Sequence, residues 1–129
     1  MSFSQPVIRR CLLLLWIAST LTVIWLSLTP GLDLPCDFVN ADKVYHMLAY
    51  LWLSALPFFA FSRSGGALTA ALAMIFLGIG LEFVQAYVPG RSFSVADMAA
   101  NSLGVILGIW LGRYMTRKHL LLAFRARAK

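Results

Sequence analysis

The chain has 129 residues, of which 60% are hydrophobic and 12% are charged, about half the charged fraction of an ordinary soluble domain. These values exclude a water-soluble globular protein and indicate one membrane domain over residues 1–129. The net charge of +6 does not indicate nucleic-acid binding, because the basic residues lie near the ends of apolar runs and not on one exposed face.

Four apolar runs, each of 18 to 22 residues, follow one another along the chain. They cover residues 11–28, 44–61, 67–88 and 95–115. Each is long enough to cross a hydrocarbon core of about 30 Å as a helix, and the segments between them carry Pro, Gly and Ser. Pro57 is expected to kink the second run. The sequence therefore predicts an all-α membrane protein built as a bundle of four transmembrane helices.

The first run has the basic start of a signal peptide, because Arg9 and Arg10 precede it. Its apolar stretch is longer than a typical signal-peptide core and no Ala-x-Ala-like site follows, so we expect an uncleaved first helix. Cys11 and Cys36 lie at opposite ends of this run, about 25 residues or roughly 37 Å apart along a helix. One disulfide cannot join them, and we expect free thiols.

The distribution of Lys and Arg sets the expected orientation. With the N-terminus inside, nine basic residues fall on the inner side and only Lys43 and Arg91 on the outer side. The nine are Arg9, Arg10, Arg63, Arg113, Arg117, Lys118, Arg125, Arg127 and Lys129. We expect both termini in the cytoplasm and the chain in a bacterial inner membrane. The basic tail, residues 116–129, suits a helix lying on anionic lipid.

The second run begins with a polar face. Asp42, His46 and Tyr50 are spaced i, i+4 and i+8, which places them on one side of a helix with Lys43 alongside. Polar groups in an apolar span are costly and indicate either a structural partner or a functional site. The structural alternatives are that Asp42 caps the helix, that Lys43 is an interfacial charge, and that His46 is only hydrogen-bonded.

The third run carries a second polar face, formed by Gly78, Glu82 and Gln85 at i, i+4 and i+7. Gly78 leaves room for a neighbouring helix to approach. A carboxylate as deep as Glu82 needs a cation, a proton or a ligand, and its expected partners are His46 and Arg91.

The fourth run aligns Asp97 and Asn101 on a face that continues into glycines. Ser94 and Asp97 also match the start of a helix, where Ser94 caps the helix and Asp97 favours its positive end. Two overlapping GxxxG steps follow, formed by Gly104, Gly108 and Gly112. These steps predict helix packing and are also the expected contact of an oligomer.

The three polar faces are expected to meet in one layer. Tyr50, Glu82 and Asn101 each lie six residues from the outer end of their run, or about 9 Å deep. A pocket between the second, third and fourth helices would then open to the outer side. Its expected ligand-binding residues are Asp42, Lys43, His46, Tyr50, Glu82, Gln85, Arg91, Asp97 and Asn101. The candidates for catalysis are His46, Glu82 and Asp97.

The same residues resemble a known family. The strings are Asp42-Lys43-x-x-His46-x-x-x-Tyr50 and Glu82-x-x-Gln85-x-x-x-Pro89-x-Arg91-x-x-Ser94-x-x-Asp97-x-x-x-Asn101-x-x-Gly104-x-x-x-Gly108. In order and spacing they are similar to the VanZ-like family, named for a teicoplanin-resistance accessory protein, over residues 42–112. The resemblance implies an integral membrane protein of the cell envelope, linked in the namesake to tolerance of a glycopeptide antibiotic.

Three functions compete. The pocket binds an anionic envelope lipid or cell-wall precursor head group through Lys43, Arg91 and His46. Alternatively, an intramembrane enzyme modifies such a lipid with His46 and Glu82 as acid and base. In the third, the polar layer only locks the helices of an assembly protein together. A metal site of Asp42, His46, Glu82 and Asp97 matches no closed zinc site, so we expect neither metal nor cofactor.

Overall fold

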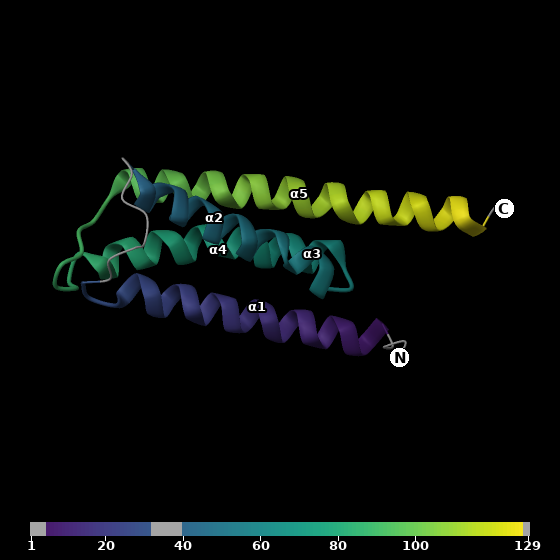
Figure 1. The fold of residues 1–129 in the computed structure, drawn as a ribbon, viewed down its shortest axis with the longest axis horizontal. Helices are drawn as coiled ribbons and strands as arrows, with labels where there is room; N and C mark the ends of the chain where they lie inside the picture. Colours follow the sequence, from purple (N-terminus) through teal and green to yellow (C-terminus); the bar gives the residue numbers. More distant parts are fainter. Residues whose placement is uncertain (1–4, 32–39, 128–129) are drawn as a thin grey trace.

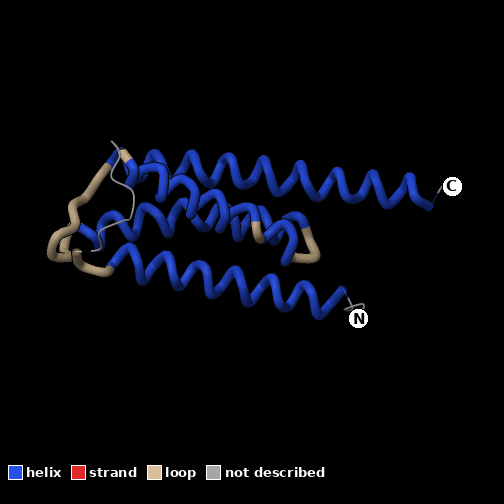
Figure 2. The backbone as a smooth tube through the Cα atoms, viewed as in Figure 1, coloured by secondary structure: helices blue, strands red, loops and turns tan. Residues whose placement is uncertain are grey.

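The computed structural model of the protein describes residues 5–31 and 40–127, with side chains as far as residue 118 (Figure 1). Its helices are α1 (Gln5–Leu28), α2 (Ala41–Ala55), α3 (Pro57–Ala60), α4 (Ser64–Gln85) and α5 (Val95–Arg127). No strand occurs among the described residues, so the predicted all-α class is confirmed (Figure 2). Cys36 and Lys129 lie outside the described residues, as do the side chains of Arg125 and Arg127.

The first and last helices are longer than predicted. α1 begins at Gln5, so that Arg9 and Arg10 lie within the helix and not before it. The fourth predicted run, residues 95–115, forms the first part of α5, which continues to Arg127 (Figure 1). Residues 116–127 of the expected basic tail therefore belong to α5, and their contact with a lipid surface stays a prediction. Residues 113–127 contain neither Gly nor Pro and are rich in Leu, Ala, Arg and Lys, which all favour continuation of a helix.

α2 and α3 replace the single helix predicted over 44–61. Proline has no N–H to continue the helical hydrogen bonds, and α2 ends two residues before Pro57. The carbonyl of Leu53, which an N–H at position 57 would otherwise meet, accepts the indole N–H of Trp16 at 2.8 Å. The predicted break at Pro57 is thus confirmed, and α1 packs on it. Together α2 and α3 cover about 20 residues, or about 30 Å.

α4 ends three residues earlier than predicted. Its helix stops at Gln85, and the N–H groups of Tyr87 and Val88 bond to carbonyls three residues back, at 3.0 Å each. Pro89 disfavours the helical conformation at Val88, and Gly90 then adopts a φ of 77° that suits glycine. This turn redirects the chain into α5.

The main packing of the bundle is between α2 and α5. A methyl group on Gly104 would collide with the backbone carbonyl of Met47, and one on Gly108 with the carbonyl of Leu51. Gly112 lies equally close to Phe58 of α3. The predicted glycine contact is therefore made within the chain, because α2 and α3 cover that face of α5.

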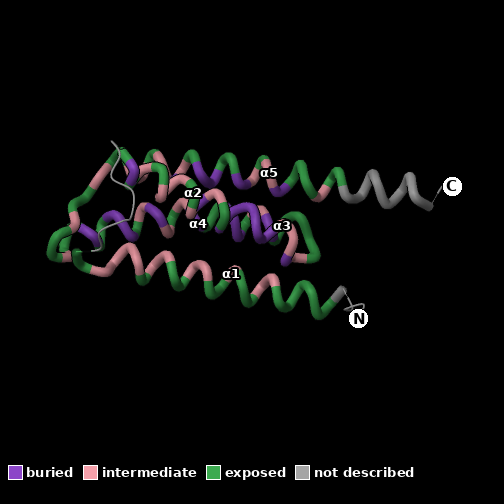
Figure 3. The backbone as a smooth tube through the Cα atoms, in the orientation of Figure 1, coloured by how far each residue is buried: buried purple, intermediate pink, exposed green. Residues whose placement is uncertain are grey.

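The exterior of the bundle is apolar. Large side chains such as Trp25, Phe76 and Trp110 are 65%, 76% and 66% exposed, whereas buried residues gather where α2, α4 and α5 meet (Figure 3). Three helices among the described residues, α1, α4 and α5, are long and apolar enough to cross a membrane. The chain is a multi-pass membrane protein, and the start of α1 and the end of α5 lie at the same end of the bundle (Figure 1).

Candidate functional site

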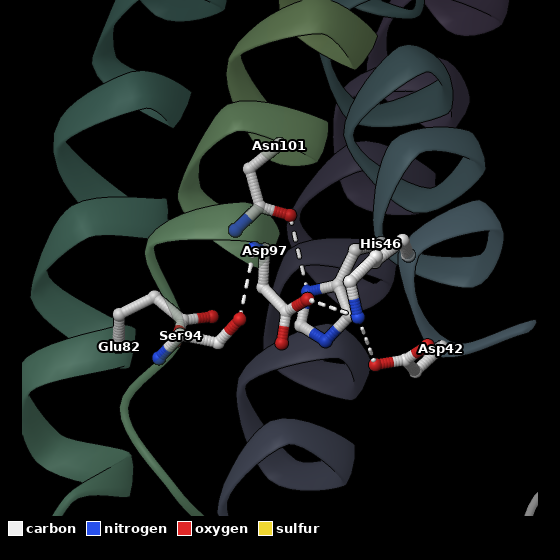
Figure 4. Close-up of polar contacts among 7 residues, drawn as sticks. Asp42, His46, Glu82, Ser94, Asp97 and Asn101 are labelled. Atoms are coloured by element: carbon white, nitrogen blue, oxygen red, sulfur yellow. Dashed lines mark hydrogen bonds and ion pairs between the residues drawn. The ribbon is translucent and has the colours of Figure 1, made fainter. Parts of the chain in front are cut away.

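A cluster of ionisable side chains lies where three helices meet near the turn that leads from α4 to α5. His46 comes from α2, Glu82 from α4 and Asp97 from the first turn of α5. One nitrogen or oxygen atom of each residue lies within 4.8 Å of the corresponding atoms of the other two (Figure 4). Glu82 is only 1% exposed and the side chain of Asp97 13% exposed. Residues far apart in the sequence thus form one buried group.

Glu82 is held by the backbone at the start of α5. The Oγ of Ser94 accepts the N–H of Asp97 at 3.2 Å, as predicted for a helix cap. In a capping box the acid at the position of Asp97 would accept the N–H of Ser94, but here Glu82 Oε2 accepts it at 3.1 Å (Figure 4). Because another helix supplies the acceptor, the carboxylate of Asp97 is left to face His46 and Lys43.

His46 is oriented by an amide. The Oδ1 atom of Asn101 lies 3.1 Å from His46 Nδ1 (Figure 4). An amide oxygen can only accept, so this contact is a hydrogen bond in the tautomer that carries the proton on Nδ1. Asn101 is 3% exposed. A methyl group on Gly78 would lie 3.1 Å from the ring of Tyr50 and 3.2 Å from the amide nitrogen of Asn101. The predicted role of Gly78, to admit its neighbours closely, is confirmed.

The ammonium group of Lys43 lies close to two carboxylates. It lies 2.8 Å from Asp42 Oδ2 and 3.6 Å from Asp97 Oδ1. Lys43 is therefore an internal counter-ion, the structural alternative considered from the sequence, and not a group directed at an anionic ligand. Asp42 is exposed and lies at the edge of the cluster.

Arg91 and Gln85 are directed to α1, not to Glu82. Arg91 donates to the carbonyls of Leu26 at 3.1 Å and Thr29 at 3.3 Å. Gln85 donates to the carbonyl of Ser27 at 2.9 Å. These carbonyls belong to the C-terminal end of α1, where they have no partner within the helix and attract positive charge. The expected Arg91–Glu82 pair is therefore wrong.

A pocket of about 200 Å³ lies beside the cluster. It is lined by Val23, Leu26, Ser27, Tyr45, His46, Ala49, Tyr50, Gln85 and Arg91. Its walls come from α1, α2 and α4, whereas the sequence predicted the second, third and fourth helices. The role of α1 was missed because its contribution consists of apolar side chains and backbone carbonyls, which leave no motif in the sequence.

The pocket and the cluster share His46. Four of the predicted ligand-binding residues line the pocket, namely His46, Tyr50, Gln85 and Arg91. The other five, Asp42, Lys43, Glu82, Asp97 and Asn101, lie outside its lining. The hydroxyl of Tyr50 is buried and has no hydrogen-bond partner among the described residues. Sequence spacing thus identified one polar region, which the structure divides into a pocket and a charged cluster.

Comparison with known proteins assigns the chain to a family. The family described as VanZ/LLP1 matches residues 3–117 of the chain. An uncharacterized protein of the fission yeast Schizosaccharomyces pombe, C11E3.10, is 30% identical over 113 residues, which cover 85% of this chain and 67% of the yeast protein. No solved structure matches the chain. The family match covers all four predicted runs and the whole cluster, and the chain is therefore a member of the VanZ/LLP1 family.

Proposed function

We propose that this protein binds the anionic head group of a membrane lipid in the pocket between α1, α2 and α4. The observation that carries the proposal is Arg91, which lines the pocket and uses two of its five N–H donors on the carbonyls of α1. Three donors are left for a ligand, and a guanidinium binds phosphate oxygens in a two-pronged geometry.

The rest of the pocket suits the upper part of a lipid. Val23, Leu26 and Ala49 are apolar, whereas the hydroxyl of Tyr50 lacks a partner and a ligand oxygen would satisfy it. A volume of about 200 Å³ is smaller than the roughly 300–1,000 Å³ of sites that enclose a whole small molecule. The pocket therefore fits a head group whose acyl chains remain in the bilayer.

The proposed topology has four spans, with α2 and α3 forming the second. The nine-to-two distribution of basic residues supports cytoplasmic termini, in the inner membrane of a bacterium, and a pocket near the outer surface. The shared location of both ends of the bundle supports an even number of spans (Figure 1).

The ligand class follows from the range of relatives. Fission yeast builds no peptidoglycan, so a relative in that organism favours a phospholipid over a cell-wall precursor as the ligand. Tolerance of a glycopeptide such as teicoplanin is then a proposed consequence of changed lipid at the outer envelope surface. The alternative enzymatic reading draws support from His46 beside two carboxylates and predicts a chemically altered lipid in cells that lack the protein.

The test compares Arg91→Gln with Arg63→Gln, an exposed arginine in the loop between α3 and α4. Both variants are purified in mild detergent, and the anionic phospholipid bound per protein is measured by mass spectrometry. We expect Arg91→Gln to retain about tenfold less lipid, because charge-assisted hydrogen bonds contribute roughly 1.5–3 kcal/mol. Arg63→Gln should resemble the wild type. Equal lipid in all three proteins would refute the proposal.

A further inference from the structure

We propose that His46, Glu82 and Asp97 form a binding site for a divalent transition-metal cation. The three residues supply one imidazole and two carboxylates from three different helices, with their ligand atoms within 4.8 Å of one another. The sequence predicts no metal here, because one imidazole with three carboxylates, Asp42 included, matches no closed zinc site. The structure removes Asp42 from the set by pairing it with Lys43 at 2.8 Å.

The spacing of the three atoms brings a cation within reach. A point equidistant from three atoms 4.8 Å apart lies about 2.8 Å from each, whereas zinc bonds to nitrogen and oxygen are about 2.0–2.2 Å. Each ligand atom therefore has to move inward by less than about 1 Å, which small side-chain rotations provide. The helices themselves need not move.

Two of the three ligands are already oriented by their neighbours. Asn101 Oδ1 lies 3.1 Å from His46 Nδ1, and in the tautomer that donates this hydrogen bond Nε2 is the ligand nitrogen. The N–H of Ser94 fixes Oε2 of Glu82 at 3.1 Å. Outer partners of this kind orient the ligands in metal sites.

The charge of the cluster also indicates a cation. Asp42, Glu82 and Asp97 carry three negative charges and Lys43 one positive charge, so the group has a formal charge of −2 with His46 neutral. Oδ1 of Asp97 is buried and accepts no hydrogen bond among the described residues, and Lys43 reaches it only at 3.6 Å. A divalent ion neutralises the group where the dielectric constant is low and unpaired charge is costly.

The donor set defines the kind of ion. Imidazole suits zinc and other transition metals, whereas carboxylates alone favour Mg²⁺ or Ca²⁺. One imidazole with two carboxylates therefore suits Zn²⁺ or Mn²⁺ and leaves at least one coordination position open. His46 and Arg91 both line the pocket, so a phosphate oxygen bound in the pocket could complete the coordination. Only this last role rests on the proposed function.

The experiment uses the full chain, purified in detergent and stripped with a chelator, and measures Zn²⁺ and Mn²⁺ bound per protein by equilibrium dialysis. We expect about one equivalent for the wild type and at least tenfold weaker binding for His46→Gln, Glu82→Gln and Asp97→Asn. Asn101→Ala should bind about 10–100-fold more weakly, because it only orients His46. Lys43→Met should bind at least tenfold more tightly, since a competing positive charge is removed.

The matched control is His119→Gln, which removes the other histidine, about 33 Å along α5 from Asp97. It should bind like the wild type. The proposal is overturned if the wild type binds neither metal. It is also overturned if the variants of His46, Glu82 and Asp97 bind both metals as well as the wild type does. Circular dichroism and gel filtration identify a variant that fails to fold. If one of the His46, Glu82 and Asp97 variants fails to fold, the metal binding of the other two tests the proposal. Lipid is measured on the same samples, so a wild type that retains lipid but binds no metal contradicts this inference alone.

Discussion

Glu82 lies 1% exposed in α4 and accepts the backbone N–H of Ser94, a bond that joins α4 to the start of α5. The first N–H groups of a helix have no partner within it, and at this end Glu82 and Ser94 each satisfy one donor. A single acid therefore has two roles, as an anchor for α5 and as a member of the charged cluster. The two roles need different properties of the side chain. The anchor needs only an oxygen that accepts a hydrogen bond, whereas the charged cluster needs the carboxylate charge.

This difference predicts opposite outcomes for two substitutions at one position. Glu82→Gln keeps an acceptor for Ser94 and should unfold close to the wild-type temperature. Glu82→Ala leaves a buried N–H unpaired and should lose about 1–3 kcal/mol of folding free energy. Thermal unfolding in detergent measures both, with Val84→Ala, on the exposed side of α4, as the control for lost volume. An alanine variant as stable as the wild type would show that the bond to Ser94 does not anchor α5.

At the scale of helices, α2 and α5 approach so closely that only glycine fits between them. Gly104 and Gly108 face backbone carbonyls of α2, which cannot rotate away as a side chain can. Close approach allows van der Waals contact along both helices, the main attraction between helices when lipid surrounds them. This contact also sets the position of Asn101 and Asp97 relative to His46, because these residues lie on the same face of α5, one and two turns before Gly104.

Gly108→Ala should therefore destabilise the protein by about 1–3 kcal/mol and weaken lipid and metal binding together, because the helices have to separate. Gly80→Ala is the matched control, since a methyl group there meets nothing within 4 Å and alanine favours a helix by up to about 1 kcal/mol. Unfolding temperature in detergent checks both. Equal destabilisation by the two substitutions would contradict the packing argument.

At the scale of the whole molecule, the loops separate into two groups at opposite ends of the bundle (Figure 1). The connection between α4 and α5 carries the site, whereas the connection between α3 and α4 lies at the end where the chain begins and finishes. In the proposed four-span topology these two ends face different compartments. The excess of basic residues at one end predicts which of them faces the cytoplasm.

A pair of introduced cysteines tests this topology. Ser62 and Ser92 are exposed residues in the two connections, and each is changed to Cys in a chain with Cys11→Ser and Cys36→Ser. A membrane-impermeant maleimide should label Ser92→Cys in intact cells and Ser62→Cys only after the cells are opened. The reverse pattern would place the pocket on the cytoplasmic side, and equal labelling of both in intact cells would contradict a crossing of the membrane by α4.

The sequence by itself determined the local features of this protein. The length of the apolar runs predicted a membrane protein, and the spacing of Gly78, Glu82 and Gln85 predicted which side of α4 is buried. Pro57 predicted the interruption between α2 and α3. These features were predictable because the helix repeat places residues three and four apart on one face, and because the hydrocarbon core sets the length of a span.

Only the tertiary structure decided which groups meet. Arg91 and Gln85 turn to carbonyls of α1, Lys43 lies between Asp42 and Asp97, and α1 forms a wall of the pocket. None of these contacts follows from spacing, because each depends on how helices distant in the sequence rotate and pack. The position of a backbone carbonyl at a helix end cannot be predicted from the side chains around it. In this structure the packing of α1 brings such carbonyls to Arg91, which bonds to them and not to Glu82.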